Sequence, residues 1–114
     1  MSGITRKSRR QIPAYLIARV KIIDSEQYRK YLDAMPSIIE KYGGKANVRS
    51  SSPLTLEGPE ERRRIVLLQF PSLEKAKEFY NSPEYQMVRT LRNGAAIGEM
   101  IAVEGIVRDE QVQR

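Results

Sequence analysis

The stretch AYLIARVKIIDSEQ, residues 14–27, decides the fold, because a strand pattern passes directly into a helix start within it. Apolar and mixed side chains alternate from Ala14 to Ile23, which is typical of a strand with one buried face. Asp24 is a predicted helix N-cap, and Gln27 three residues later completes a capping-box pattern. The chain is therefore predicted to begin with a strand that leads straight into a helix.

The rest of the chain repeats this order. Apolar residues recur at helical spacing as far as Tyr42, with a kink or break expected at Pro36, because proline cannot donate a hydrogen bond to the carbonyl of Leu32. Strands are predicted over 45–50, 64–70 and 99–107, with a short strand extension over 54–57, and helices are predicted to follow Ser72 and Ser82. This order indicates the α+β class: a ferredoxin-like βαββαβ fold with a four-stranded antiparallel sheet.

A length of 114 residues favours one domain, predicted over residues 13–107. Residues 1–12 are predicted to be a disordered basic tail, and residues 108–114 a polar C-terminal tail. Most of the net charge of +6 falls in the first tail, and Glu60-Glu61 neutralises the later run of arginines, 62–64, locally. Nucleic acid is therefore not the expected partner. No apolar run is long enough for a membrane span or a signal peptide, so we expect a cytoplasmic protein with no membrane partner.

The chain contains no cysteine and no histidine. This composition excludes thiolate nucleophiles, imidazole bases and the common zinc and haem ligands. We find no acidic cluster suited to magnesium, calcium or manganese, so no metal and no cofactor are expected.

Both helices of such a fold pack on one side of the sheet, which leaves the other side open to solvent or to a partner. The side chains predicted on that open side are half apolar and half polar: Tyr15, Ile17, Arg19, Lys21, Asn47, Arg49, Ile65, Leu67 and Gln69. A sheet face that is simply exposed to solvent would carry fewer apolar residues, and a face buried in a hydrophobic core would carry fewer charged ones. We therefore expect a homodimer in which two such faces enclose a cavity.

Several motifs resemble the bacterial family known as domain of unknown function 1330. They are Phe70-Pro71-Ser72-Leu73-Glu74, the run from Phe79 to Gln86, Arg92 and Glu104-Gly105, together with Tyr31, Gly43-Gly44, Arg49 and Glu57-Gly58. The resemblance runs from about Pro13 to Ile106 and implies a dimeric α/β barrel of ferredoxin-like protomers. The superfamily so implied also contains cofactor-free monooxygenases, isomerases and haem-degrading enzymes, and the family itself has no agreed reaction.

The candidate site residues combine these motifs with the predicted open face. Tyr85 and Glu57 are the catalytic candidates, and the ligand-binding candidates are Tyr15, Arg19, Tyr31, Asn47, Arg49, Ser82 and Arg92. Structural alternatives stay open for several of them. Tyr31 fits amphipathic core packing, Ser82 and Tyr85 fit a helix cap, and Arg49 with Glu57 fits a buried ion pair as well as it fits carboxylate binding and a proton relay.

Two functions from different classes fit these residues. The first is a metal-free enzyme that acts on a small organic acid or polyketide-like compound in a dimer cavity. The alternative is a noncatalytic metabolite-binding or stress-associated module. Both predict a small anionic or aromatic ligand, because arginine and tyrosine are the polar residues expected in the pocket.

Overall fold

The computed structural model describes residues 12–107 of the chain. The predicted basic tail, apart from Ile12, and the predicted tail of residues 108–114 lie outside these residues. The elements in chain order are β1 (Ala14–Ile22), α2 (Ser25–Lys41), β2 (Lys45–Ser50), β3 (Arg64–Phe70), α3 (Leu73–Asn81), α4 (Pro83–Arg89), the 3₁₀ turn η1 (Thr90–Arg92) and β4 (Ala96–Glu104). This order confirms the predicted ferredoxin-like βαββαβ fold.

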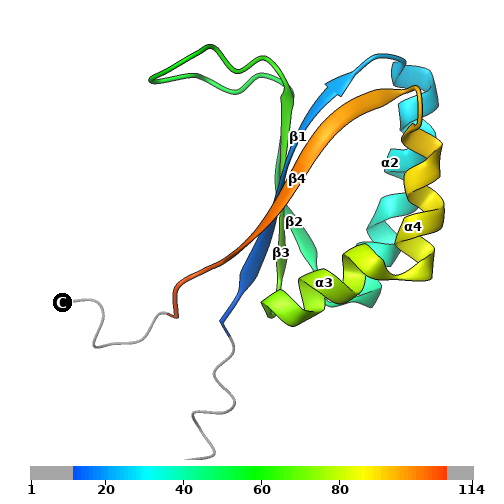
Figure 1. The fold of residues 1–114 in the computed structure, drawn as a ribbon, viewed down its shortest axis with the longest axis vertical. Helices are drawn as coiled ribbons and strands as arrows, with labels where there is room; N and C mark the ends of the chain where they lie inside the picture. Colours follow the sequence, from blue (N-terminus) through cyan, green and yellow to red (C-terminus); the bar gives the residue numbers. More distant parts are fainter. Residues whose placement is uncertain (1–11, 108–114) are drawn as a thin grey trace, which may run out of the picture.

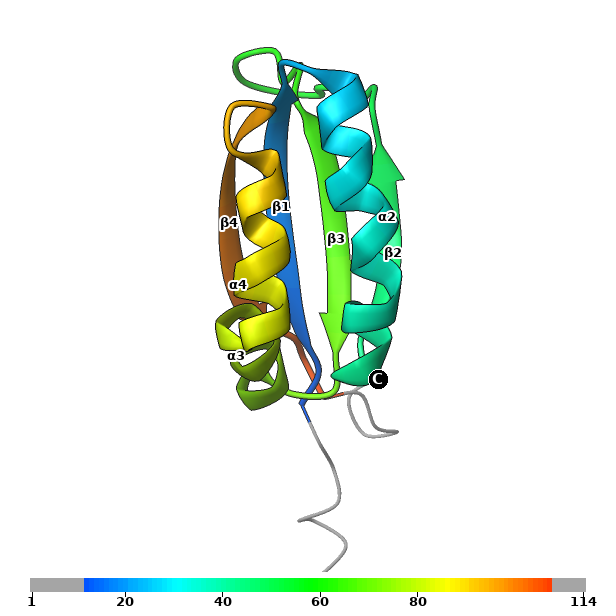
Figure 2. The same cartoon turned by 90° about the vertical axis from the view of Figure 1, so that its right-hand side faces the viewer.

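The four strands form one antiparallel sheet in the order β2-β3-β1-β4. All the helices lie on one side of it, as Figure 1 shows edge-on and Figure 2 shows from the helix side. We call the covered side the helix face; β1 places Ala14, Leu16, Ala18 and Val20 there, all buried. We call the other side the open face; β1 places Tyr15, Ile17, Arg19 and Lys21 there.

The local signals for helix starts are confirmed. The Asp24 side chain accepts a hydrogen bond from the backbone N–H of Gln27 at 3.1 Å, as a helix N-cap does. Ser72 caps α3 in the same way, through the backbone N–H of Lys75. Gly43, just beyond α2, has a φ of 81°, a left-handed conformation in which glycine ends a helix without strain.

Three details of the prediction are wrong. The break that was one alternative at Pro36 does not occur: helix α2 is continuous there, because Met35, Ile38 and Ile39 pack into the core on both sides of the proline and hold the turn despite its missing hydrogen bond. Residues 54–57 form no strand, and β4 occupies 96–104 instead of 99–107 because it pairs along the whole length of β1.

Residues 51–63 connect β2 to β3 without helix or strand, and we call this segment the arm. The arm projects from one end of the sheet on the side opposite the helices, as the green segment at the top left of Figure 1 shows. The helices and the arm therefore lie on opposite sides of the sheet.

Candidate functional site

The described residues enclose a cavity of about 330 Å³ between α2 and the helix face of the sheet. Most of its wall is apolar, contributed by β1, β2, β3, β4 and one side of α2. The apolar residues on the wall are Leu16, Ala18, Val20, Leu32, Met35, Pro36, Ile39, Ala46, Val66, Leu68 and Met100. A wall of this kind suits the hydrocarbon body of a small organic molecule.

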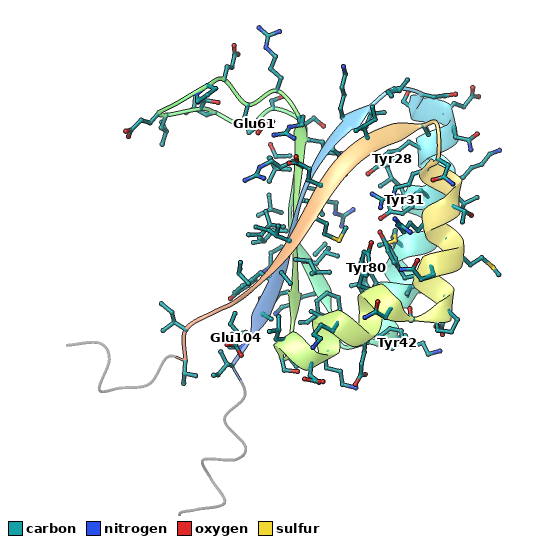
Figure 3. All side chains as sticks on the ribbon, viewed as in Figure 1. Tyr28, Tyr31, Tyr42, Glu61, Tyr80 and Glu104 are labelled. Atoms are coloured by element: carbon teal, nitrogen blue, oxygen red, sulfur yellow. The ribbon has the colours of Figure 1, made fainter. Side chains whose placement is uncertain are left out.

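Two stacked tyrosines of α2 supply the aromatic part of the wall. The rings of Tyr28 and Tyr31 lie 5.4 Å apart between centroids, and Figure 3 shows both side chains on the sheet side of the helix. Burial raises the pKa of Tyr28 and of Tyr31 above the usual value for a phenol, and for Tyr31 the hydrogen bond with Tyr85 adds to the rise. Both side chains are therefore neutral hydroxyl groups at physiological pH.

A hydrogen bond with Tyr85 orients the Tyr31 hydroxyl. The two hydroxyl oxygens lie 2.9 Å apart, and Tyr85 is completely buried at the start of α4. Tyr85 does not itself line the cavity. Tyr31 therefore lines the cavity, and its hydrogen bond with the buried Tyr85 fixes the orientation of its hydroxyl.

Three arginines from three separate elements line the cavity: Arg49 of β2, Arg64 of β3 and Arg92 of η1. The guanidinium of Arg92 lies 5.4 Å from the centre of the Tyr31 ring, a cation–π distance. The Nε of Arg64 is buried and has no hydrogen-bond partner within residues 12–107. Ion pairs between described residues include none of these arginines. The one carboxylate on the wall is Glu40, so the cavity carries an excess of positive charge.

The structure brings three predicted ligand-binding residues, Tyr31, Arg49 and Arg92, to this cavity. Arg49 lies on a different face of the sheet from the one that the sequence predicted. Strand alternation placed it with Asn47 on the open face, but a β-bulge between Ala46 and Val48 shifts the register. Arg49 consequently pairs with Val66 on the helix face, and the predicted face is wrong.

The other predicted site residues lie elsewhere. Tyr15, Arg19 and Asn47 are on the open face, where the Asn47 side chain donates a hydrogen bond to the Gln69 side-chain oxygen at 2.8 Å. Glu57 is exposed in the arm, does not line the cavity and forms no ion pair with Arg49.

Ser82 is a structural helix cap. Its hydroxyl accepts from the backbone N–H of Tyr85 at 3.1 Å and donates to the carbonyl of Phe79 at 2.8 Å. Both hydrogen-bonding functions of the hydroxyl are thus used within the chain, which favours the capping alternative for this residue.

Two cavity residues, Arg64 and Tyr28, were missed as site residues. The arginine run was interpreted as locally neutralised, and this is correct for Arg62 and Arg63, which pair with Glu60 and Glu61. The signal for Arg64 lies in its strand phase, because it alternates with Val66 and Leu68 and therefore shares the helix face with them. Tyr28 has the same helical spacing as Tyr31, and this spacing predicts a core position as readily as a position on a cavity wall.

Two features are absent from the described part of the chain. No group of three or more acidic side chains that could hold a metal ion occurs in residues 12–107. None of the helices there is both long and apolar enough to span a membrane.

Comparison with solved structures finds the same fold in several proteins. A protein of unknown function from Rhodopseudomonas palustris, RPA0582, matches with a TM-score of 0.69 and 20% identity, over 93% of this chain and 94% of that one. SnoaB, a cofactor-independent oxygenase from Streptomyces nogalater, matches with a TM-score of 0.60 and 8% identity, over 87% and 96%. A candidate antibiotic biosynthesis monooxygenase from Caulobacter crescentus matches with a TM-score of 0.56 and 9% identity, over 90% and 98%.

Comparison with curated protein sequences gave no match. These solved structures share one protomer fold, the α+β fold found in proteins of the dimeric α+β barrel class, and this chain has the same fold. Within that class, the chain belongs to the family described as domain of unknown function DUF1330, whose model matches residues 13–106.

Proposed function

We propose that the cavity binds a small organic anion, with an apolar or aromatic body against the wall and an acidic group at the arginines. The single observation that carries this proposal is the convergence of Arg49, Arg64 and Arg92 on one apolar cavity without ion pairs among the described residues. A buried donor without a partner, such as Arg64 Nε, costs free energy in the empty protein, and an anionic ligand would recover it.

The same groups define the chemistry that the cavity could support. The neutral Tyr31 hydroxyl and the nearby guanidinium of Arg92 would stabilise negative charge that develops on a bound molecule. The wall has hydrogen-bond donors and cations, with Glu40 as its one carboxylate and no histidine or cysteine as a base. We infer an enzyme whose substrate is itself acidic and reacts as its own anion, in keeping with the cofactor-independent oxygenase among the structural neighbours. The alternative of a noncatalytic binding module requires the same ligand without turnover.

Binding of a matched pair of probes tests the proposal. We expect 2-naphthoate to bind at least about tenfold more tightly than the neutral 2-naphthalenemethanol in isothermal titration calorimetry, because a charged hydrogen bond is stronger than a neutral one. Arg64→Met should abolish that preference. Arg29→Met, which removes an exposed arginine of α2 outside the cavity, should retain it. Equal affinity for both probes in the wild type would disprove the anion proposal.

Turnover separates the enzyme from the binding module. Native mass spectrometry of the purified protein would identify a bound compound, and incubation of that compound with fresh protein would show whether it is converted. Conversion that Tyr31→Phe abolishes, while binding persists, supports an enzyme. Retention of the unchanged compound supports the binding module.

The open face supports a homodimer. Its half-buried residues Ile17, Ile65 and Leu67 adjoin more exposed ones on the edge strands, Val48, Ile97, Ile101 and Val103. An apolar sheet face of this kind is stable in water when a second sheet covers it. Sedimentation at micromolar concentration should give twice the chain mass of 13.1 kDa. A natively folded monomer under these conditions would disprove the dimer.

A further inference from the structure

The arm, residues 51–63, carries two leucines that nothing in the described chain covers. Leu54 is 82% exposed and Leu56 is 88% exposed, which makes them the most exposed large apolar side chains described. Pro53 and Thr55, which alternate with them, are partly buried. The arm therefore presents both leucines on one side and turns its other side back toward its own chain.

Hydrogen bonds and ion pairs hold the base of the arm in place. The Thr55 hydroxyl oxygen accepts a hydrogen bond from the backbone N–H of Glu61 at 2.8 Å, which closes the segment on itself. Arg63 then binds Glu61 through Nε at 2.8 Å and Glu99 of β4 through Nη1 at 3.1 Å. These contacts join the arm to the open face, and Figure 3 shows Glu61 where the arm meets the sheet.

The open face next to the arm is suited to an identical partner. Four charged groups beside the arm are already paired within one chain, since Arg19 and Arg63 lie between Glu61 and Glu99, and Lys21 at the end of β1 is the unpaired charge next to them among the described residues. Two such faces can approach without a strong repulsion between like charges. A further exposed apolar residue, Ile97 of β4 at 63% exposure, pairs with Lys21 at the end of the sheet where the arm projects.

We propose that the arm is a clasp that packs Leu54 and Leu56 onto a second copy of this chain. The arm projects from the sheet on the side of the open face. A two-fold arrangement that packs two open faces against each other therefore places each arm beside the partner chain. The leucines then lose the exposure that they have in a single chain. This inference rests on the proposed homodimer and adds to it the segment that holds the two copies together.

Sedimentation of three variants tests the clasp separately from the dimer. We expect Leu54→Ser combined with Leu56→Ser to raise the dimer dissociation constant at least about tenfold, because two apolar side chains are removed from the contact. Met87→Ser is the matched control, because Met87 is 74% exposed on α4, on the helix side, and should leave the constant unchanged. Ile101→Lys should break the open-face contact itself.

The outcomes distinguish the two proposals. Dissociation by Ile101→Lys without any effect of the leucine variant would overturn the clasp and keep the open-face dimer. A dimer that survives both changes, or a monomeric wild type, would overturn both proposals.

A fluorescence experiment reports on the arm directly, since the chain contains no tryptophan. The sole tryptophan of Leu56→Trp should shift its emission to the blue as the protein concentration rises through the dissociation constant. The same residue introduced as Met87→Trp should show no such shift. Emission of Leu56→Trp that stays unchanged on dimerisation would overturn the clasp.

Discussion

The two faces of the sheet carry arginines in opposite electrostatic settings. On the open face, Arg19 and Arg63 lie between the carboxylates of Glu61 and Glu99. On the helix face, Arg49, Arg64 and Arg92 surround a cavity whose one carboxylate is Glu40. A neutralised face can be covered by an identical face, whereas an uncompensated cluster attracts an anion. This contrast is the basis of our two proposals, that the open face serves assembly and that the cavity on the helix face serves binding.

The largest expected effect comes from two adjacent leucines of β3 on opposite faces. Leu68 is buried on the helix face, so Leu68→Ala should cost about 2 to 5 kcal/mol of unfolding free energy at any protein concentration. Leu67 points to the open face, so Leu67→Ala should cost about 1 kcal/mol or less in the monomer and should weaken the dimer. Urea unfolding at two protein concentrations measures both. If both variants lost the same unfolding free energy at both protein concentrations, the proposed difference between the two faces would be wrong.

The next effect concerns the buried tyrosines of the cavity. The pKa values of Tyr28 and Tyr31 are raised in the folded state, so the unfolded chain loses these protons first as the pH rises. The stability that they contribute is therefore complete below about pH 10 and falls above it. Thermal unfolding from pH 8 to pH 11, with tyrosinate absorbance near 295 nm, should show ionisation of these residues together with unfolding. Tyr31→Phe should reduce the decline, and ionisation of both residues in the folded protein would contradict the expectation.

A smaller effect is expected for Ser82, which tests whether it belongs to the site. Ser82→Ala removes the cap of α4 and should cost about 1 kcal/mol of stability. The affinity for 2-naphthoate should stay unchanged, because Ser82 does not line the cavity. Loss of binding in a variant of nearly normal stability would restore Ser82 as a ligand-binding residue.

The smallest effect on stability is expected for Arg49, which sharpens the contrast between the faces. Arg49 is exposed and forms no ion pair with another described residue, so Arg49→Ala should change the unfolding free energy by no more than about 0.5 kcal/mol. The same change should weaken the binding of 2-naphthoate. A stability loss of about 3 kcal/mol or more would instead show a structural ion pair.

The fold could be predicted in detail because its signals are local. Asp24, Ser72 and Ser82 each cap a helix within three residues of their own position, and the β3 strand matches its apolar run at both ends. The candidate site could be predicted only in part. Tyr31, Arg49 and Arg92 were selected from motifs and helix positions, but the sequence pattern placed Arg49 on the wrong face.

The sequence by itself determined the order of strands and helices, the helix caps and the uncovered sheet face, because each depends on spacings of two to four residues along one segment. Only the tertiary structure decided where the arginines meet. Strand register is a property of two paired strands, and the bulge beside Ala46 inverts every side chain beyond it in β2, Arg49 included. The three arginines of the cavity come from β2, β3 and η1, and a pattern within any one of these segments cannot show that they meet.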